Sequence, residues 1–270
     1  MRYIIGGILS SLLWTTFCNA GELRAGISEQ RYVGETDTNE QSYRGYHFDL
    51  SKFVGRPDFA KLSDTMRGQV DLVESVGLGQ RVLDFFRTVP IKGDELACLE
   101  SEVPTVACYG APIGTQLEPT ENLSVWDSKT SRWTISNPLH PLAPAVSEHV
   151  VYVHPSIKFE PKEPVVLHEM LHAFHDQALP DGNDNKGVLF YYSNAKSKQL
   201  YAADAYLMRN QKEFFAVTAS IFLYGNDHVN EPFTRATLKE KQPDYYRYLV
   251  SLFERDPDRA PDATPVASAH

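Results

Sequence analysis

An apolar segment with three histidines constrains the fold of this chain more than any other feature. Residues 165–177 read VVLHEMLHAFHDQ, and Pro164 precedes them while Pro180 follows. A proline in the first turn and another beyond the last turn are typical of a helix, so we expect one between these two residues. Its many apolar residues predict that this helix is buried. Burying histidines and a glutamate costs several kcal/mol unless they are paired or bind a metal.

Two of the histidines have the spacing of metal ligands. His168 and His172 are four residues apart, which puts them on one helix face, one turn apart. Two such imidazoles can bind one zinc ion at about 2.0–2.1 Å. Glu169 points about 100° away from His168, where it can reach a water on the metal and act as a general base. A His-Glu-x-x-His match also arises by chance on the order of once in fifty such chains, so a metal-free pair of core histidines stays an alternative.

A catalytic zinc needs a third protein ligand and an open position for water. Position 178, ten residues beyond His168, is an alanine, so the third ligand is not a histidine at that spacing. His175 lies on roughly the same face as His168 and His172 but a further turn along, too far for three rings to converge on one ion. We therefore expect His175 and Asp176 to support the ligands or to have a structural role rather than to bind the metal.

A buried carboxylate in the C-terminal half is the candidate third ligand. The sequence predicts a long, buried helix over residues 200–224. Within it, Glu213 is the only acidic residue between Asp204 and Asp227, and an unpaired carboxylate in apolar surroundings is costly. Zinc is a natural partner for this group. One alternative stays open, in which Asn210 caps the helix and Glu213 completes a capping box.

These two segments together resemble a known family. HEMLH, followed about forty residues later by YLMRNQKEFFA, resembles the gluzincin metallopeptidases, in particular the anthrax lethal factor catalytic domain and the Mlc titration factor A family. The resemblance covers residues 164–225. It implies that Glu213 is the third zinc ligand beside His168 and His172, and that Tyr206, seven residues before Glu213, donates a hydrogen bond to the oxyanion.

The function that this resemblance implies is a zinc metallopeptidase. Glu169 takes the proton of a zinc-activated water and later gives it to the leaving amine, while Tyr206 stabilises the tetrahedral oxyanion. Two helical turns, about 10.5 Å of rise, would separate Tyr206 from Glu213 on one face of the same helix. The strand expected at residues 149–155 would offer an exposed edge to an extended peptide.

Two other functional classes stay open at this point. One is a zinc-containing binding or toxin-like module without peptidase turnover. The other is a plain scaffold that binds no metal. A complete set of ligands, base and oxyanion donor favours the enzyme, since a binding module has no reason to keep it.

The remaining segments indicate a mixture of helices and strands. Apolar residues at helical spacing predict a helix over residues 60–77, and a short helix follows in GQRVLDFFRTVPI. β-Branched and aromatic residues predict a hairpin with its turn at 127–131, besides the strand at 149–155. The order of elements favours the α+β class. We expect a single zincin-like metallopeptidase domain over residues 21–255, with a small sheet and a zinc-binding helix pair, and a disordered tail over 256–270.

The first twenty residues have the pattern of a secretory signal peptide. Arg2 precedes the apolar run YIIGGILSSLLWTTF, and CNA before Gly21 predicts cleavage after Ala20. We therefore expect a secreted or periplasmic protein with no membrane contact after cleavage. A membrane anchor is the alternative, although the run is shorter than a bilayer span. In an exported protein, Cys98 and Cys108 are expected to form a disulfide rather than two buried thiols.

Net charge limits the partners of the protein. The chain of 270 residues carries a net charge of −9 at pH 7, and loss of residues 1–20 removes one arginine and no acidic residue, which makes the charge −10. This excess argues against nucleic acid or an anionic membrane as the main partner. We expect a protein or peptide substrate, one zinc ion per chain and a monomer.

Overall fold

A computed structural model describes most of the chain after its first 39 residues. The described residues are 40–94, 106–110, 123–127, 132–136, 149–157 and 163–259. The predicted signal peptide and Cys98 lie outside these residues. The predicted disulfide of Cys108 and the predicted export therefore stay predictions.

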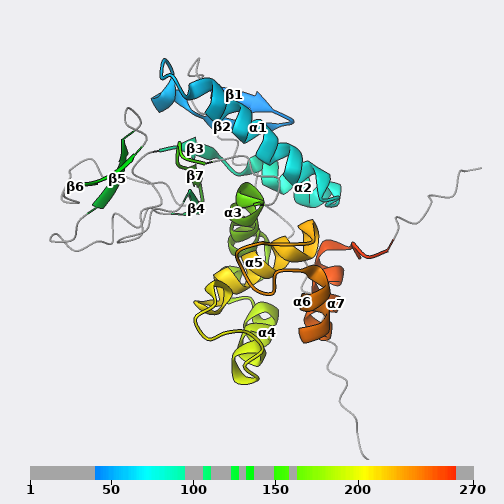
Figure 1. Cartoon of the computed structure of the whole chain (residues 1–270). Helices are drawn as coiled ribbons and strands as arrows, with labels where there is room; N and C mark the ends of the chain where they lie inside the picture. Colours follow the sequence, from blue (N-terminus) through cyan, green and yellow to red (C-terminus); the bar gives the residue numbers. More distant parts are fainter. Residues whose placement is uncertain are drawn as a thin grey trace, which may run out of the picture.

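A mixed five-stranded sheet forms one side of the fold (Figure 1). Its strands, in spatial order, are β1 (Glu40–Tyr43), β2 (Tyr46–Asp49), β3 (Ile91–Gly93), β7 (Val151–Val153) and β4 (Ala107–Tyr109). Strands β2, β3 and β7 are parallel, whereas β1 and β4 pair antiparallel at the two edges. The strand expected at 149–155 is therefore confirmed as β7, but the prediction that it offers an exposed edge is wrong. Strand β4 covers that edge of β7 and is itself the edge strand.

The predicted hairpin is confirmed as a separate two-stranded sheet. Its strands are β5 (Leu123–Asp127) and β6 (Arg132–Ser136), which pair antiparallel from Leu123 opposite Ser136 to Asp127 opposite Arg132. The sheets and the helices of the described residues together confirm the α+β class.

The described residues include seven α-helices. They are α1 (Phe59–Ser75), α2 (Gln80–Thr88), α3 (Val165–Ala173), α4 (Lys186–Ser197), α5 (Gln211–Tyr224), α6 (Arg235–Lys241) and α7 (Pro243–Phe253). The helices expected over 60–77 and in the segment after Gly79 are confirmed as α1 and α2. None of the helices in the described ranges has the length and apolar character needed to cross a membrane. Helix α4 was not predicted, because its apolar residues show no clear helical period.

The long helix expected over 200–224 is shorter than predicted. It begins at Gln211, because the side chain of Asn210 accepts hydrogen bonds from the backbone N–H groups of Lys212 and Glu213. Asparagine is a strong N-cap residue, and the backbone of Asn210 is itself extended, so the helix does not continue before it. Tyr206 lies before the cap, in a short 3₁₀ turn over Tyr206–Met208.

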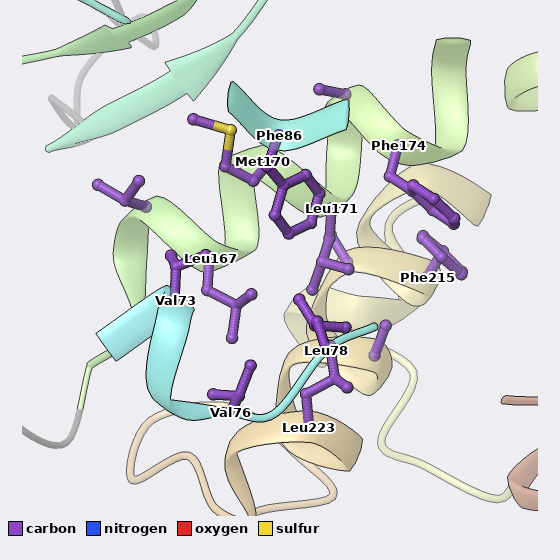
Figure 2. Close-up of a cluster of buried hydrophobic side chains, with 14 of the residues drawn as sticks. Val73, Val76, Leu78, Phe86, Leu167, Met170, Leu171, Phe174, Phe215 and Leu223 are labelled. Carbon is purple, nitrogen blue, oxygen red and sulfur yellow. The ribbon is translucent and has the colours of Figure 1, made fainter. Parts of the chain in front are cut away.

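Helix α3 lies at the centre of the core. It contacts α1 on one side, α5 on another, and strands β4 and β7 (Figure 1). Figure 2 shows apolar side chains of α3 packed among those of α1, α2, α5 and the segment after α1: Leu167, Met170, Leu171, Phe174, Val73, Val76, Leu78, Phe86, Phe215 and Leu223. The predicted burial of this helix is confirmed.

The C-terminal helices are joined to the residues that follow them by polar contacts. Tyr246 of α7 donates a hydrogen bond to Asp256 Oδ1 at 2.9 Å, and Lys239 of α6 donates to Asp258 Oδ2 at 2.7 Å. The first residues of the predicted tail thus pack against α6 and α7. Residues 260–270 of that tail lie outside the described residues.

Candidate metal centre

Three predicted ligand residues meet at one point between α3 and α5. The Nε2 atoms of His168 and His172 are 3.1 Å apart. Oε2 of Glu213 lies 3.4 Å from Nε2 of His168 and 3.3 Å from Nε2 of His172. Among the described residues, these three form the one group of three or more His, Cys, Asp or Glu side chains that could hold a metal ion.

The size of this triangle fits a zinc ion. Ligand atoms at about 2.0–2.1 Å from a tetrahedral zinc lie about 3.3 Å from one another, and the three measured separations lie between 3.1 and 3.4 Å. Oε2 of Glu213 is also buried without a hydrogen-bond partner among the described residues. A buried, unpaired carboxylate oxygen is costly, and a cation at the centre of the triangle would remove that cost.

Protonation states in the site follow from burial and from the nearby charges. Burial alone would raise the pKa of Glu213, but its contacts with His168 and His172 outweigh burial and hold that pKa well below its ordinary value. For His168 the balance is the reverse. Burial lowers its pKa, whereas Glu213 and Glu169 raise it, and the net direction is upward. A raised pKa of His168 favours its protonated form, which competes with metal binding.

Glu169 is buried beside the ligands. Its side chain is 7% exposed, and burial raises its pKa, although the two histidines and a backbone hydrogen bond from Tyr109 oppose this rise. A carboxylate with a raised pKa is suited to take up a proton at neutral pH and to release it again. Glu169 also lines the cleft described below. The structure thus places Glu169 beside the three candidate ligands, and its role as the base stays a prediction.

Tyr206 lies near the site but on a different element from the one predicted. It lies in the 3₁₀ turn before α5, so the expected spacing of two turns on the same helix as Glu213 is wrong. Its ring nevertheless lies close to the site, with its centroid 6.3 Å from that of His168, and the guanidinium of Arg209 stacks over it at 4.7 Å. The turn brings Tyr206 to the wall of the cleft.

A cleft of about 390 Å³ opens beside the metal ligands. Strand β4 and the residue before it form one wall, the start of α3 forms the floor, and the loop after α5 forms another wall. The lining residues are Val106, Ala107, Glu163, Pro164, Val165, His168, Glu169, Tyr206, Ser220, Asp227, Val229 and Asn230. The candidate base and the candidate oxyanion donor therefore face the same open space.

The residues after α3 do not contact the ligands as expected. A π-helical turn, Phe174–Ala178, follows α3. His175 is buried against Phe215 at a ring distance of 4.8 Å, and neither of its ring nitrogens has a hydrogen-bond partner among the described residues. Asp176 instead accepts hydrogen bonds from Tyr109 and Asn183. The supporting role predicted for these two residues thus takes the form of core packing for His175 and a contact with β4 for Asp176.

Sequence reasoning missed the residue that caps α3, the helix that carries His168 and His172 and is called the ligand helix below. The N-cap residue of α3, Pro164, makes no side-chain cap. The buried Gln69 of α1 takes this role, since its Oε1 accepts from Val166 N and its Nε2 donates to the carbonyl of Glu163, both at 3.2 Å. A signal was present, because Gln69 lies on the apolar face of α1, three residues after Met66.

The fold and the site together define an α+β protein with a His-His-Glu group that could hold a metal ion, next to an open cleft with a buried carboxylate. No family model matches the chain. A Pro-Pro endopeptidase of Paenibacillus alvei is 31% identical over 122 residues, which is 41% of this chain and 49% of that protein. The chain thus spans about half the length of this relative.

The solved structure of the Pro-Pro endopeptidase from Paenibacillus alvei is a weaker match. It covers 72% of this chain and 92% of the other, with 20% sequence identity and a TM-score of 0.40. At this score the superposition supports no conclusion about the site. The likeness to a peptidase therefore rests on the sequence match.

Proposed function

We propose that the protein is a zinc-dependent peptidase that hydrolyses peptide bonds within polypeptide substrates. The observation that carries the proposal is the triangle of His168, His172 and Glu213, whose sides match the ligand spacing of a tetrahedral zinc. The sequence similarity to a Pro-Pro endopeptidase supports the same class of reaction. The resemblance to the gluzincins stays part of the proposal.

Glu169 and Tyr206 would each have a role in this reaction beside the candidate ligands. When bound, zinc would lower the pKa of a water molecule and polarise the scissile carbonyl. Glu169 would accept the proton of the attacking water and deliver it to the leaving amine, for which its raised pKa is suited. Tyr206 would donate a hydrogen bond to the oxyanion of the tetrahedral intermediate.

Strand β4 is the proposed docking edge for the substrate, in place of β7. Gly110 N donates to the carbonyl of Val150, and His154 N donates to that of Val106. In an antiparallel pair the bonding direction alternates, so the backbone groups of Ala107 point away from β7 toward the cleft that Ala107 lines. An extended peptide can pair with these groups by strand addition.

The bond to test first is one between two prolines. The relative with the detectable sequence match is named for cleavage at Pro-Pro. Apolar side chains from the residue before β4, the start of α3 and the loop after α5, namely Val106, Val165 and Val229, line the cleft and provide surfaces on which a proline ring could pack. We propose a proline-containing peptide as the substrate class.

The experiment compares the wild type with Glu169→Gln on a peptide library that contains Pro-Pro and other bonds. We expect one zinc per chain by elemental analysis in both proteins, with hydrolysis only in the wild type. Glu240→Gln is the matched control, because Glu240 is an exposed glutamate on α6. Turnover by Glu169→Gln would exclude Glu169 as the base. Zinc without turnover in the wild type would favour a binding module, and absence of zinc would favour a metal-free scaffold.

We also propose that the protein is exported. The support is the signal-peptide pattern of residues 1–20. The N-terminal sequence of the protein recovered from outside the cytoplasm should then begin at Gly21. A protein that stays inside the cell with Met1 or Arg2 at its N-terminus would contradict the proposal.

A further inference from the structure

We propose that the hydrogen bond between Tyr109 and Asp176 is a positioning contact, which holds edge strand β4 against the ligand helix and so fixes Glu169 and the substrate edge. This inference rests on the proposed peptidase function for its catalytic consequence. Its structural part, the anchoring of β4, is independent of any activity. Neither residue is among the predicted ligands.

The contact is well defined in the structure. Tyr109 Oη donates to Asp176 Oδ2 at 2.9 Å and accepts from Gln177 Nε2 at 2.8 Å. His149 Nδ1 lies 2.9 Å from the same hydroxyl and 3.1 Å from Asp176 Oδ2. Asn183 Nδ2 donates to the other carboxylate oxygen, Asp176 Oδ1, at 2.8 Å. Both oxygens of Asp176 are thus engaged, which restricts the side chain to one orientation.

The π-helical turn explains why Asp176 faces β4. A π turn contains one more residue than an α turn, so it changes the direction of every side chain that follows. In this turn the side chains of Asp176 and Gln177 hydrogen-bond to Tyr109 of β4. The side chain of His175 instead points into the core and packs against Phe215 of α5. Turns of this kind are frequent at functional sites, and this one directly extends the helix that carries Glu169.

The loop after the π turn packs closely against the backbone of Asp176. Gly182 has a φ of +55°, and a Cβ atom there would lie 2.7 Å from the carbonyl oxygen of Asp176. Only glycine fits this close approach without a shift of the backbone. The approach also positions Asn183, the next residue, to donate to Asp176.

Through this contact Tyr109 is bonded twice to the helical segment that carries the proposed base, Glu169. The backbone N–H of Tyr109 donates to the carboxylate of Glu169, while the hydroxyl of Tyr109 is bonded to Asp176 on the same helical segment. Strand β4 has three residues, and within the sheet it pairs with β7 on one side. The backbone hydrogen bonds to β7 alone hold such a short edge strand weakly. The hydrogen bond from Tyr109, the last residue of β4, to Asp176 adds a second point of attachment.

The test uses Tyr109→Phe and Asp176→Ala, each of which removes the bond from one side. We expect zinc content to stay at one per chain, kcat to fall about tenfold or more because misplaced catalytic groups lose rate steeply, and KM to change less than kcat. The double variant should be no slower than the slower single variant, because the two residues act through one contact. In parallel, hydrogen exchange of the backbone amides at residues 106–110 should be faster in both single variants.

Tyr246→Phe is the matched control. Tyr246 donates a similar hydrogen bond, at 2.9 Å to a carboxylate oxygen of Asp256, but from α7. It should keep the wild-type kcat and the wild-type exchange at β4. Unchanged exchange at 106–110 in Tyr109→Phe, an equal loss of kcat in Tyr246→Phe, or loss of zinc in Tyr109→Phe would overturn the inference. If the wild type cleaves no peptide, the proposed function fails, and the exchange data still decide whether the contact anchors β4.

Discussion

Oε2 of Glu213 lies 3.3 Å from Nε2 of His172, although the two residues belong to different helices and are far apart in the sequence. The contact depends on where α5 begins. Glu213 is the third residue of this helix, directly after the cap at Asn210, and its carboxylate therefore lies near a helix N-terminus, where a negative charge is favourable. If Glu213 is a ligand, as proposed, the cap at Asn210 would hold its carboxylate in place before a metal binds.

Loss of the Glu213 carboxylate should impair metal binding itself. In Glu213→Gln we expect zinc affinity to fall by more than about a hundredfold, because loss of a residue that only supports a ligand costs about 10–100-fold and Glu213 is the proposed third ligand itself. A competition titration with a zinc chelator measures the affinity. Glu240→Gln should match the wild type. Equal affinity in Glu213→Gln and wild type would show that Glu213 is not a ligand.

The hydroxyl of Tyr206 should matter for turnover but not for metal binding. In Tyr206→Phe we expect kcat to fall by about 10²–10³, the usual effect of losing one oxyanion donor, with unchanged zinc content. Steady-state kinetics on a cleaved peptide tests this. Tyr192→Phe is the control, because Tyr192 also donates a hydrogen bond near this turn, to the carbonyl of Met208. A wild-type kcat in Tyr206→Phe would remove Tyr206 from the mechanism.

The cap at Asn210 should affect both stability and zinc affinity. Asn210→Ala is expected to lower the free energy of unfolding by about 1 kcal/mol and to weaken zinc binding, because Glu213 lies in the first turn of the capped helix. Asn185→Ala removes the corresponding cap of α4, where Asn185 accepts from Val188 N. It should lower stability and leave zinc affinity unchanged. If both variants bind zinc equally well, the cap does not position the ligand.

Buried His175 should make the folded protein sensitive to mild acid. Burial lowers the pKa of His175 to about 3, with smaller effects from His172 and Lys212, whereas an unfolded histidine titrates near about 6.5. Below about pH 6.5 the unfolded chain binds a proton that the folded protein does not. The free energy of unfolding then falls, by up to about 2 kcal/mol between pH 7 and pH 5.

In His175→Met this part of the acid sensitivity should disappear. Chemical denaturation of metal-free protein at pH 7 and pH 5 measures it, and the contributions of the candidate zinc ligands, which both proteins keep, cancel when the two differences are compared. His228→Gln, which changes an exposed histidine, should keep the wild-type difference between the two pH values. The same difference in His175→Met as in the wild type would show that His175 is protonated in the folded protein.

Sequence reasoning reached the parts of the site that are local. The proximity of His168, Glu169 and His172 follows from their spacing within one helix, and the isolation of Glu213 made it the candidate third ligand, which the structure places beside the two histidines. Tyr206 was identified by resemblance, but its predicted place on α5 was wrong because the side chain of Asn210 competes with helix formation at that point.

Long-range features of the fold were beyond the reach of local patterns. The sequence of β7 does not reveal that β4 pairs with it, because strand order is decided by contacts between distant segments. The Tyr109–Asp176 contact needed both that strand order and a π turn that no local signal marked.

The amide of Gln69 has a consequence for how such a protein could be switched on. This side chain belongs to α1 and caps the N-terminus of α3 by hydrogen bonds to the backbone of Val166 and Glu163. Helices α1 and α2 also cover one side of α3 with apolar side chains (Figure 2). Cutting the chain after residue 94 and releasing the part before it would expose that side and leave the helix uncapped. Residues 40–94 therefore belong to the core that holds α3, and we expect their removal to destabilise the candidate metal site rather than to release an intact one.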